Sequence, residues 1–107
     1  MEETIRKEEA ITGAEEQEAV IEAVLFTMGS SVELRRLALA IGQPEAVARE
    51  AVERLMKRYS GQHRGMEILQ LEDSYQMCTR AQYYENLIRV ASAPKKQVLS
   101  EVMLETL

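Results

Sequence analysis

Residues 66–79, MEILQLEDSYQMCT, mark the point at which the hydrophobic periodicity of this chain changes. Upstream, apolar residues recur every three to four positions, which is typical of amphipathic helices. In this stretch they alternate along two short runs, at Met66, Ile68, Tyr75 and Met77. The polar segment 72–74 separates the runs as a turn would. The pattern therefore predicts a β-hairpin, and further apolar residues indicate that its outer face is also covered: Leu69, Leu71 and Cys78.

Three helices are expected before the hairpin, over residues 14–28, about 33–41 and 44–59. Residues 12–15, TGAE, match a capping box, and Gly29 and Gly42 are suited to end the first two helices. Pro44 fits the first turn of the third helix. That helix has the clearest buried stripe: Val47, Ala48, Ala51, Val52, Leu55, Met56 and Tyr59. In the second helix, Leu34, Leu37, Ala38 and Ile41 share one face.

A fourth helix is expected over residues 81–91, with four apolar residues on one side: Tyr84, Leu87, Ile88 and Ala91. Three helices, a hairpin wing and a fourth helix give an α+β fold of the winged helix-turn-helix type, assigned to residues 14–91. Residues 1–13 are expected to form a flexible acidic tail and residues 92–97 a linker. Residues 98–107 are interpreted as a helix that has only begun when the sequence stops.

The charge distribution argues against binding to a DNA duplex. The net charge is −5, and outside residues 1–16 there are 12 acidic and 11 basic residues, so the folded body is nearly neutral. Proteins that bind phosphate backbones usually carry a basic stripe. The third helix instead carries two rows of charge predicted to pair along its solvated face: Arg49, Glu53 and Lys57, then Glu50, Arg54 and Arg58. We therefore expect no specific DNA binding, although a winged-helix transcriptional regulator remains the alternative.

Motifs that carry catalysis or bind metals are not found in the sequence. His63 is the single histidine and is expected at the surface, while Cys78 shows no pattern of an activated thiolate. One cysteine and one histidine cannot make a zinc site, and no phosphate-binding loop occurs. The sequence predicts no enzyme, no cofactor and no membrane span. The single cysteine and the acidic N-terminus fit a cytoplasmic protein.

The first helix has more apolar surface than one small core needs. Its apolar residues cover an arc of about 260°, whereas a helix facing one core needs somewhat over ~100°. Only Glu18 and Glu22 mark a polar strip. We interpret the excess as a surface for a protein partner, most simply a homodimer, with three candidate residues on this helix and one on the second: Val20, Val24, Phe26 and Leu39. Alternatively, the hairpin and the fourth helix cover this surface within one monomer.

Several stretches resemble the segregation and condensation protein B (ScpB) family. Residues 19–26, AVIEAVLF, with Met28-Gly29 resemble its first helix, I-E-A-L-L-F before a small residue and glycine. Leu37-Ala38 with Ala40-Ile-Gly42 resembles its L-A-x-A-L-G. Residues 65–68 and 75–79 resemble its G-x-E-I and Y-Q-L-x-T hairpin. Leu99-Ser100 with Leu104-Glu-Thr-Leu107 resembles the start of its second winged helix. The resemblance covers residues 18–107; Asp73-Ser74 departs from it, since the family often has glycines there.

The resemblance implies a fold and a function. It implies a winged-helix domain from a non-enzymatic subunit of the bacterial SMC–kleisin complex, which acts in chromosome condensation and partition during the cell cycle and cell division. Such a subunit forms a homodimer and binds the kleisin, ScpA. Through the kleisin it associates with the SMC ATPase and hence with the nucleoid. The chain itself has no ATP-binding motif, in keeping with ATP chemistry that belongs to the ATPase.

Overall fold

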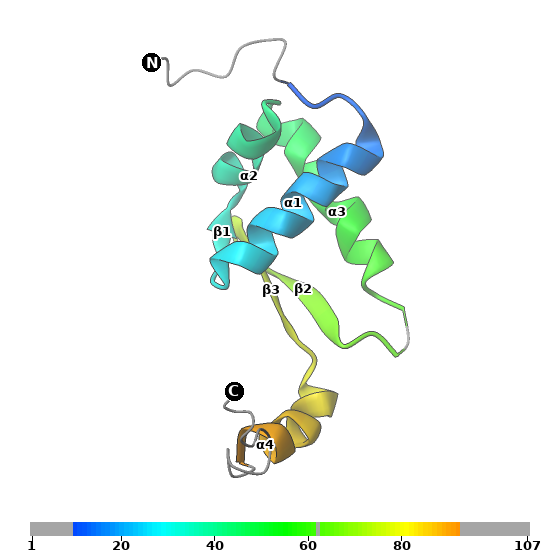
Figure 1. The fold of residues 1–107 in the computed structure, drawn as a ribbon. Coiled ribbons are helices and arrows are strands. Elements are labelled where there is room, and N and C mark those ends of the chain that lie inside the picture. The colour runs from blue at the N-terminus through cyan, green and yellow to red at the C-terminus, as the bar shows by residue number, and fades with distance from the viewer. Residues whose placement is uncertain (1–9, 62, 93–107) are drawn as a thin grey trace, which may run out of the picture.

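The structure, a computed structural model, describes residues 10–61 and 63–92. Four α-helices and three short strands follow one another in the order expected of a winged helix (Figure 1). Helices α1 and α2 flank a two-residue strand, and α3 leads into the hairpin: α1 (Ala14–Met28), β1 (Val32–Glu33), α2 (Leu34–Ile41), α3 (Glu45–Arg58), β2 (Met66–Leu71) and β3 (Ser74–Thr79). A 3-10 turn, η2 (Ala81–Tyr83), then precedes α4 (Tyr84–Ser92). The predicted α+β winged-helix fold is confirmed.

The sheet contains one strand that the sequence did not reveal. Its order is β1-β3-β2 with antiparallel pairing throughout, and Val32 of β1 lies opposite Tyr75 of β3. Two residues are too few to show an alternating pattern, so β1 left no signal. The hairpin turn consists of Glu72 and Asp73, with Glu72 at φ 60°. The Asp73 carbonyl accepts a 2.8 Å hydrogen bond from the Leu34 backbone N–H, which ties the turn to the start of α2.

A single hydrophobic core lies between the helices and the inner face of the sheet. The predicted faces of α2, α3 and the hairpin all contribute to it, as does the inward side of α1. Its members are Ile21, Leu25, Val32, Leu34, Leu37, Ala38, Ile41, Ala48, Ala51, Val52, Leu55, Ile68, Tyr75 and Met77. These residues come from every helix but α4 and from all three strands, so α1, α2, α3 and the sheet share one core to which α4 does not contribute.

Helix α1 begins at Ala14 as predicted, and α3 begins at Glu45 with Pro44 as its N-cap rather than in its first turn. Gly29 and Gly42 end α1 and α2 in the left-handed conformation, at φ 69° and 64°. The predicted capping box is wrong, because Gly13 is the N-cap of α1 and no side chain caps this end. The Gln17 side-chain amide instead donates a 2.7 Å hydrogen bond to the carbonyl of Ile11. The chain is thus fixed one turn before the helix by a bond that no capping motif describes.

Ile11 lies in the segment expected to be a flexible tail, yet the structure packs it against the core. Its backbone N–H donates a 2.9 Å hydrogen bond to the carbonyl of Ile41. Its carbonyl accepts bonds from the side chains of Gln17 and Gln43, the latter at 3.0 Å. Residues 1–9 lie outside the described residues, as do the remainder of the expected linker after Ser92 and the expected second-domain start at 98–107.

Helix α4 does not return to the core. Figure 1 shows it beyond the open end of the hairpin, opposite the turn, and away from α1, α2 and α3. Every residue from Tyr84 to Ser92 is exposed, including Tyr84, Leu87 and Ile88 on the face predicted to be apolar. The alternative in which the fourth helix covers α1 within one monomer is therefore not the arrangement seen here.

We predict that Ile11→Ala lowers the free energy of unfolding by about 1–2 kcal/mol, less than the ~2–5 kcal/mol of a fully buried site because Ile11 is only partly buried. The midpoint of thermal unfolding should fall by about 4–8 °C per kcal/mol in a domain of this size. Thr12→Ala is the matched control, since Thr12 is exposed. Equal midpoints for the two variants would show that Ile11 contributes nothing to stability.

Candidate protein-docking surface

The polar strip of α1 faces α3 and fixes which side of α1 reaches solvent. Glu18 is buried, with its side chain only 7% exposed, and one carboxylate oxygen accepts a 2.7 Å hydrogen bond from Arg54 Nε. Arg58 Nε lies 3.0 Å from the other oxygen as an ion pair. Arg54 also donates a 3.3 Å bond to the Gln17 side-chain carbonyl. A buried carboxylate needs such partners, because unpaired burial of a charge is costly.

This contact corrects the prediction that both charge rows of α3 are solvated ladders. Within the described ranges, the ion pairs join Glu18 to Arg54, Glu18 to Arg58 and Glu33 to Arg35, and none of them lies along α3. Arg54 and Arg58 of the second row thus pair with Glu18 of α1 rather than with acidic residues along α3. The i, i+4 spacing was compatible with both arrangements, so the sequence could not distinguish them.

With its polar strip turned inward, α1 exposes part of its apolar surface. Phe26 is 72% exposed, and Ala19 and Ala23 on the same side are exposed as well. Val20 and Val24 are half-buried and pack against the core, so they offer little area to a partner. Leu39, the fourth predicted residue, is 58% exposed on the outer side of α2. The structure therefore separates the four: Phe26 lies on the free face of α1, Val20 and Val24 turn inward, and Leu39 stands on another helix.

The exposed side of α1 borders an open, largely apolar groove. On α1 the lining residues are spaced i, i+3, i+4 and i+7: Ala19, Glu22, Ala23 and Phe26. Tyr59 after the end of α3 and the hairpin residues Met66 and Met77 complete the lining. From the sequence, Glu22 belongs to the polar strip and the alanines do not stand out, because a wide apolar arc does not show which part the core leaves free. An open apolar surface of this kind is typical of a protein-docking site.

Polar contacts hold the floor of this groove in place. The Tyr59 hydroxyl donates a hydrogen bond to the Glu22 carboxylate, and this bond together with burial raises the pKa of Tyr59 above its ordinary value. The Arg64 guanidinium lies 5.1 Å from the centroid of the Tyr59 ring. Arg80 donates through its guanidinium to the Tyr59 carbonyl. Glu22 is thus engaged with Tyr59, which leaves the groove mostly apolar in character.

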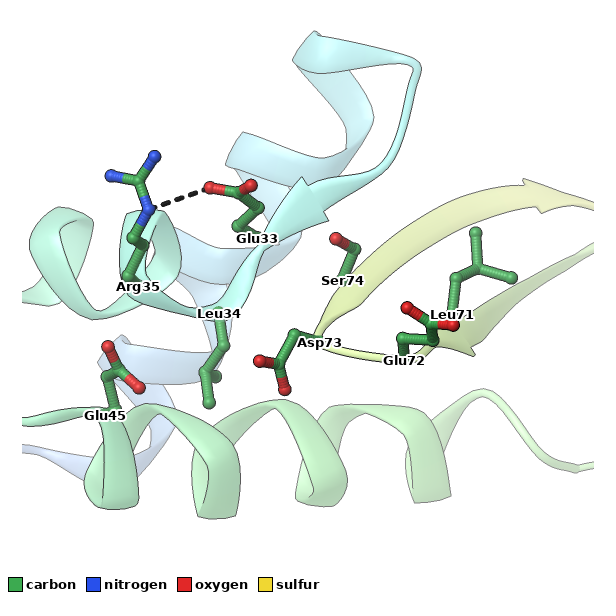
Figure 2. Close-up of a pocket in the computed structure, with 8 residues that line it drawn as sticks. All are labelled: Glu33, Leu34, Arg35, Glu45, Leu71, Glu72, Asp73 and Ser74. Carbon is green, nitrogen blue, oxygen red and sulfur yellow. Dashed lines mark ion pairs between the residues drawn. The ribbon is translucent and has the colours of Figure 1, made fainter.

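A second cavity lies at the opposite end of the hairpin and is acidic (Figure 2). The turn residues Glu72 and Asp73 line it with Glu33 and with Glu45 at the start of α3. Arg35 also lines it, but its guanidinium is paired with Glu33 at 2.9 Å. In a DNA-binding winged helix, α3 and the wing would meet the duplex. With Glu33 paired to Arg35, the carboxylates of Glu45, Glu72 and Asp73 leave this junction with a net negative charge, which would repel the phosphate backbone.

Two further reactive side chains lie in the part of the chain that the structure describes, those of His63 and Cys78. His63 is exposed in the loop after α3, as predicted. Cys78 is half-buried on β3, and burial raises the pKa of its thiol, which disfavours the thiolate. Within the described residues, no three His, Cys, Asp or Glu side chains gather where they could hold a metal ion. None of the described helices is long and apolar enough to cross a membrane.

A winged-helix core, an acidic wing turn and an apolar groove beside α1 define a winged-helix domain with an exposed apolar face. The family comparison agrees with the resemblance noted in the sequence. Residues 19–107 match the model of the segregation and condensation complex subunit ScpB. The chain belongs to this family.

Relatives support the assignment over the same part of the chain. It is 53% identical over 90 residues to segregation and condensation protein B of Agathobacter rectalis. The matched segment covers 83% of this chain and 48% of the relative. It is 47% identical over 90 residues to the protein of the same name from Lachnoclostridium phytofermentans, covering 84% and 48%. The chain thus spans about half the length of the curated relatives it matches.

Solved structures share the fold. A crystal structure of a dimer of the ScpB N-terminal domain complexed with a ScpA peptide superimposes with a TM-score of 0.68 at 24% identity, covering 73% of this chain and 99% of that one. ScpB from Mycobacterium tuberculosis gives a TM-score of 0.69 at 24% identity, covering 79% of this chain and 55% of that one. At these identities the likeness establishes the winged-helix fold.

We predict that Glu18→Ala lowers the free energy of unfolding by about 1–3 kcal/mol, because it leaves Arg54 and Arg58 facing a buried position without their partner. Glu16→Ala, an exposed position in the first turn of the same helix, should cost less than about 1 kcal/mol. Urea unfolding followed by circular dichroism measures both. Equal losses would show that the contact between α1 and α3 does not depend on Glu18.

Proposed function

We propose that this chain is a non-enzymatic assembly subunit of the bacterial chromosome condensation machinery. In this proposal it forms a homodimer in the cytoplasm and binds the kleisin ScpA. Through ScpA it joins the SMC ATPase at the nucleoid, in chromosome condensation and segregation. Membership of the ScpB family supports the general role, and the protein-docking face of α1 supports action through contacts rather than chemistry.

The observation that carries this proposal is the exposed apolar face of α1 in a domain whose core is already complete. Phe26 is the largest exposed residue on α1 and lies beside Ala19 and Ala23, so that covering this face with a partner would remove apolar surface from water. The structural neighbour described above is a dimer of the corresponding domain with a ScpA peptide. That neighbour supports both partners proposed for this chain.

Dimerisation is tested first. The chain should sediment as a dimer at tens of micromolar, and Phe26→Glu should raise the dimer dissociation constant by about tenfold or more, the loss of one well-placed contact. Thr27→Glu adds the same charge at the next exposed position of α1 and should change the constant little. A wild-type chain that is monomeric at this concentration would contradict the proposal. Leu39→Glu, measured in parallel, decides whether α2 takes part.

ScpA binding is tested separately. A peptide from the kleisin of the same organism, titrated by calorimetry, should bind the dimeric chain with measurable affinity. Phe26→Glu then shows whether binding depends on dimerisation. If the dimer forms but shows no binding to any segment of the kleisin, this part of the chain is not the kleisin-binding part.

A DNA-binding regulator is the competing function, supported only by the winged-helix order of elements. The acidic cavity between α3 and the hairpin turn opposes it. We predict only weak, non-specific affinity for duplex DNA at physiological salt, near the ~10⁻⁴–10⁻⁶ M of non-specific binders. Fluorescence anisotropy with labelled duplexes measures it. A sequence-specific affinity of about 10⁻⁸ M or tighter would favour the regulator.

A further inference from the structure

We propose that Arg80 is a hinge lock that fixes the direction in which α4 leaves the body formed by α1, α2, α3 and the sheet. The inference concerns a single copy of the chain, so it is independent of the homodimer and of the ScpA binding proposed above. It depends on three observations. Helix α4 has no buried residue, the segment that leads into it is stiff, and Arg80 ties the start of that segment to the body.

Packing does not fix the direction of α4. Each residue from Tyr84 to Ser92 is exposed, and none of them belongs to the core. A helix that buries no side chain has little packing to hold it at a set angle to its neighbours. Its direction therefore depends on the segment through which it is attached to β3, as the arrangement in Figure 1 shows.

The segment between β3 and α4 is a stiff lever with one joint. The 3-10 turn η2 runs directly into α4, and the Tyr84 N–H donates a hydrogen bond to the Ala81 carbonyl across the junction. The Tyr83 N–H bonds the Arg80 carbonyl at 3.0 Å, so helical bonding begins at Arg80. Arg80 itself is extended, at φ −77° and ψ 140°. The joint between the strand and the lever thus lies at Arg80.

Arg80 attaches this joint to the body through its backbone and its side chain. Its N–H donates a 2.9 Å hydrogen bond to the Gly65 carbonyl. Its guanidinium donates through Nη2 to the Tyr59 carbonyl and through Nε, at 3.4 Å, to the Met66 carbonyl. The acceptors lie at the C-terminal end of α3 and at the start of β2, so one residue joins both elements to the lever.

The geometry of these acceptors explains why an arginine suits this position. Bridging two carbonyl oxygens requires donors on separate atoms held in one plane, which a guanidinium has and the ammonium of lysine lacks. The Tyr59 residue that supplies one carbonyl is itself held, because its hydroxyl donates to Glu22 and the Arg64 guanidinium lies 5.1 Å from its ring centroid. Arg80 is half-buried, and bonds shielded from water in this way are stronger than exposed ones.

A small change at this joint becomes a large displacement at the far end of α4. Together η2 and α4 extend about 20 Å, so a rotation of about 20° at Arg80 would move Ser92 by about 7 Å. Residues 93–107 follow Ser92 in the sequence. The lock therefore also sets the point from which the rest of the chain continues.

Distances between two spin labels in the whole chain test the inference. In a Cys78→Ser background, one label is attached at Glu50→Cys on the exposed side of α3 and the other at Asn86→Cys on α4. Doubly labelled protein is diluted with an excess of unlabelled chain, so that only distances within one copy are measured. With Arg80 present, double electron–electron resonance should give one narrow distance distribution.

Arg80→Ala should widen this distribution by about twofold or more, or shift its mean by about 5 Å or more, because the joint loses both guanidinium bonds. Arg80→Lys should widen it too, although it keeps the charge, because an ammonium cannot bridge both carbonyls. Arg89→Ala removes an exposed arginine of α4 itself and is the matched control, which should leave the distribution unchanged. Circular dichroism verifies that each variant retains its helix content.

Two results would overturn the inference. One is a distribution that neither Arg80→Ala nor Arg80→Lys changes, which would show that the direction of α4 does not depend on the guanidinium. The other is a distribution that is already as broad with Arg80 present as it is in Arg80→Ala, which would show that α4 is not held. If Arg80→Ala does not fold, Arg80→Lys decides by the same comparison, since it retains the backbone bond to Gly65 and the charge.

Discussion

The paired charges between α1 and α3 determine what the rest of this domain presents to its surroundings. The Glu18 carboxylate is paired with Arg54 and Arg58 of α3. A rotation of α1 about its axis, in either direction, would separate Glu18 from both arginines and leave a buried charge without partners. With that face fixed, Ile21 and Leu25 enter the core, and Ala19, Ala23 and Phe26 must face outward. A buried polar contact thus specifies an orientation that the apolar residues of α1, spread over most of its circumference, do not.

Most of the fold could be predicted from the sequence, because most of it is encoded locally. The stripe of α3, the glycines that end α1 and α2, and the alternation in the hairpin each depend on neighbours a few positions away. What could not be predicted depends on distant partners. Strand β1 exists only because Val32 and Glu33 pair with β3, and Ile11 is fixed by the carbonyl of Ile41 and the side chain of Gln43.

The candidate site shows the same division. The excess of apolar surface on α1 was visible in the sequence, but which part of it is free depends on where α3 lies. Val20 and Val24 therefore turned inward, and Phe26 remained outside with Ala19 and Ala23. The two ends of the hairpin then differ in chemistry: the turn closes an acidic cavity, and the open end, with Met66 and Met77, borders the apolar groove. A fold known for reading DNA here carries a surface suited to a protein.

The position of β3 has a mechanical consequence. It is the central strand, hydrogen-bonded to β1 on one side and to β2 on the other, and α4 continues directly from its end through Arg80. A tension applied to the chain beyond α4 is therefore transmitted along β3. The tension then acts parallel to the strands, so the hydrogen bonds between β2 and β3 are loaded in shear. Bonds loaded in shear bear the force together, whereas bonds that are unzipped break one after another. Tyr75 and Met77 of β3 belong to the same core as the helices, so the load on this strand reaches the packing of α1, α2 and α3.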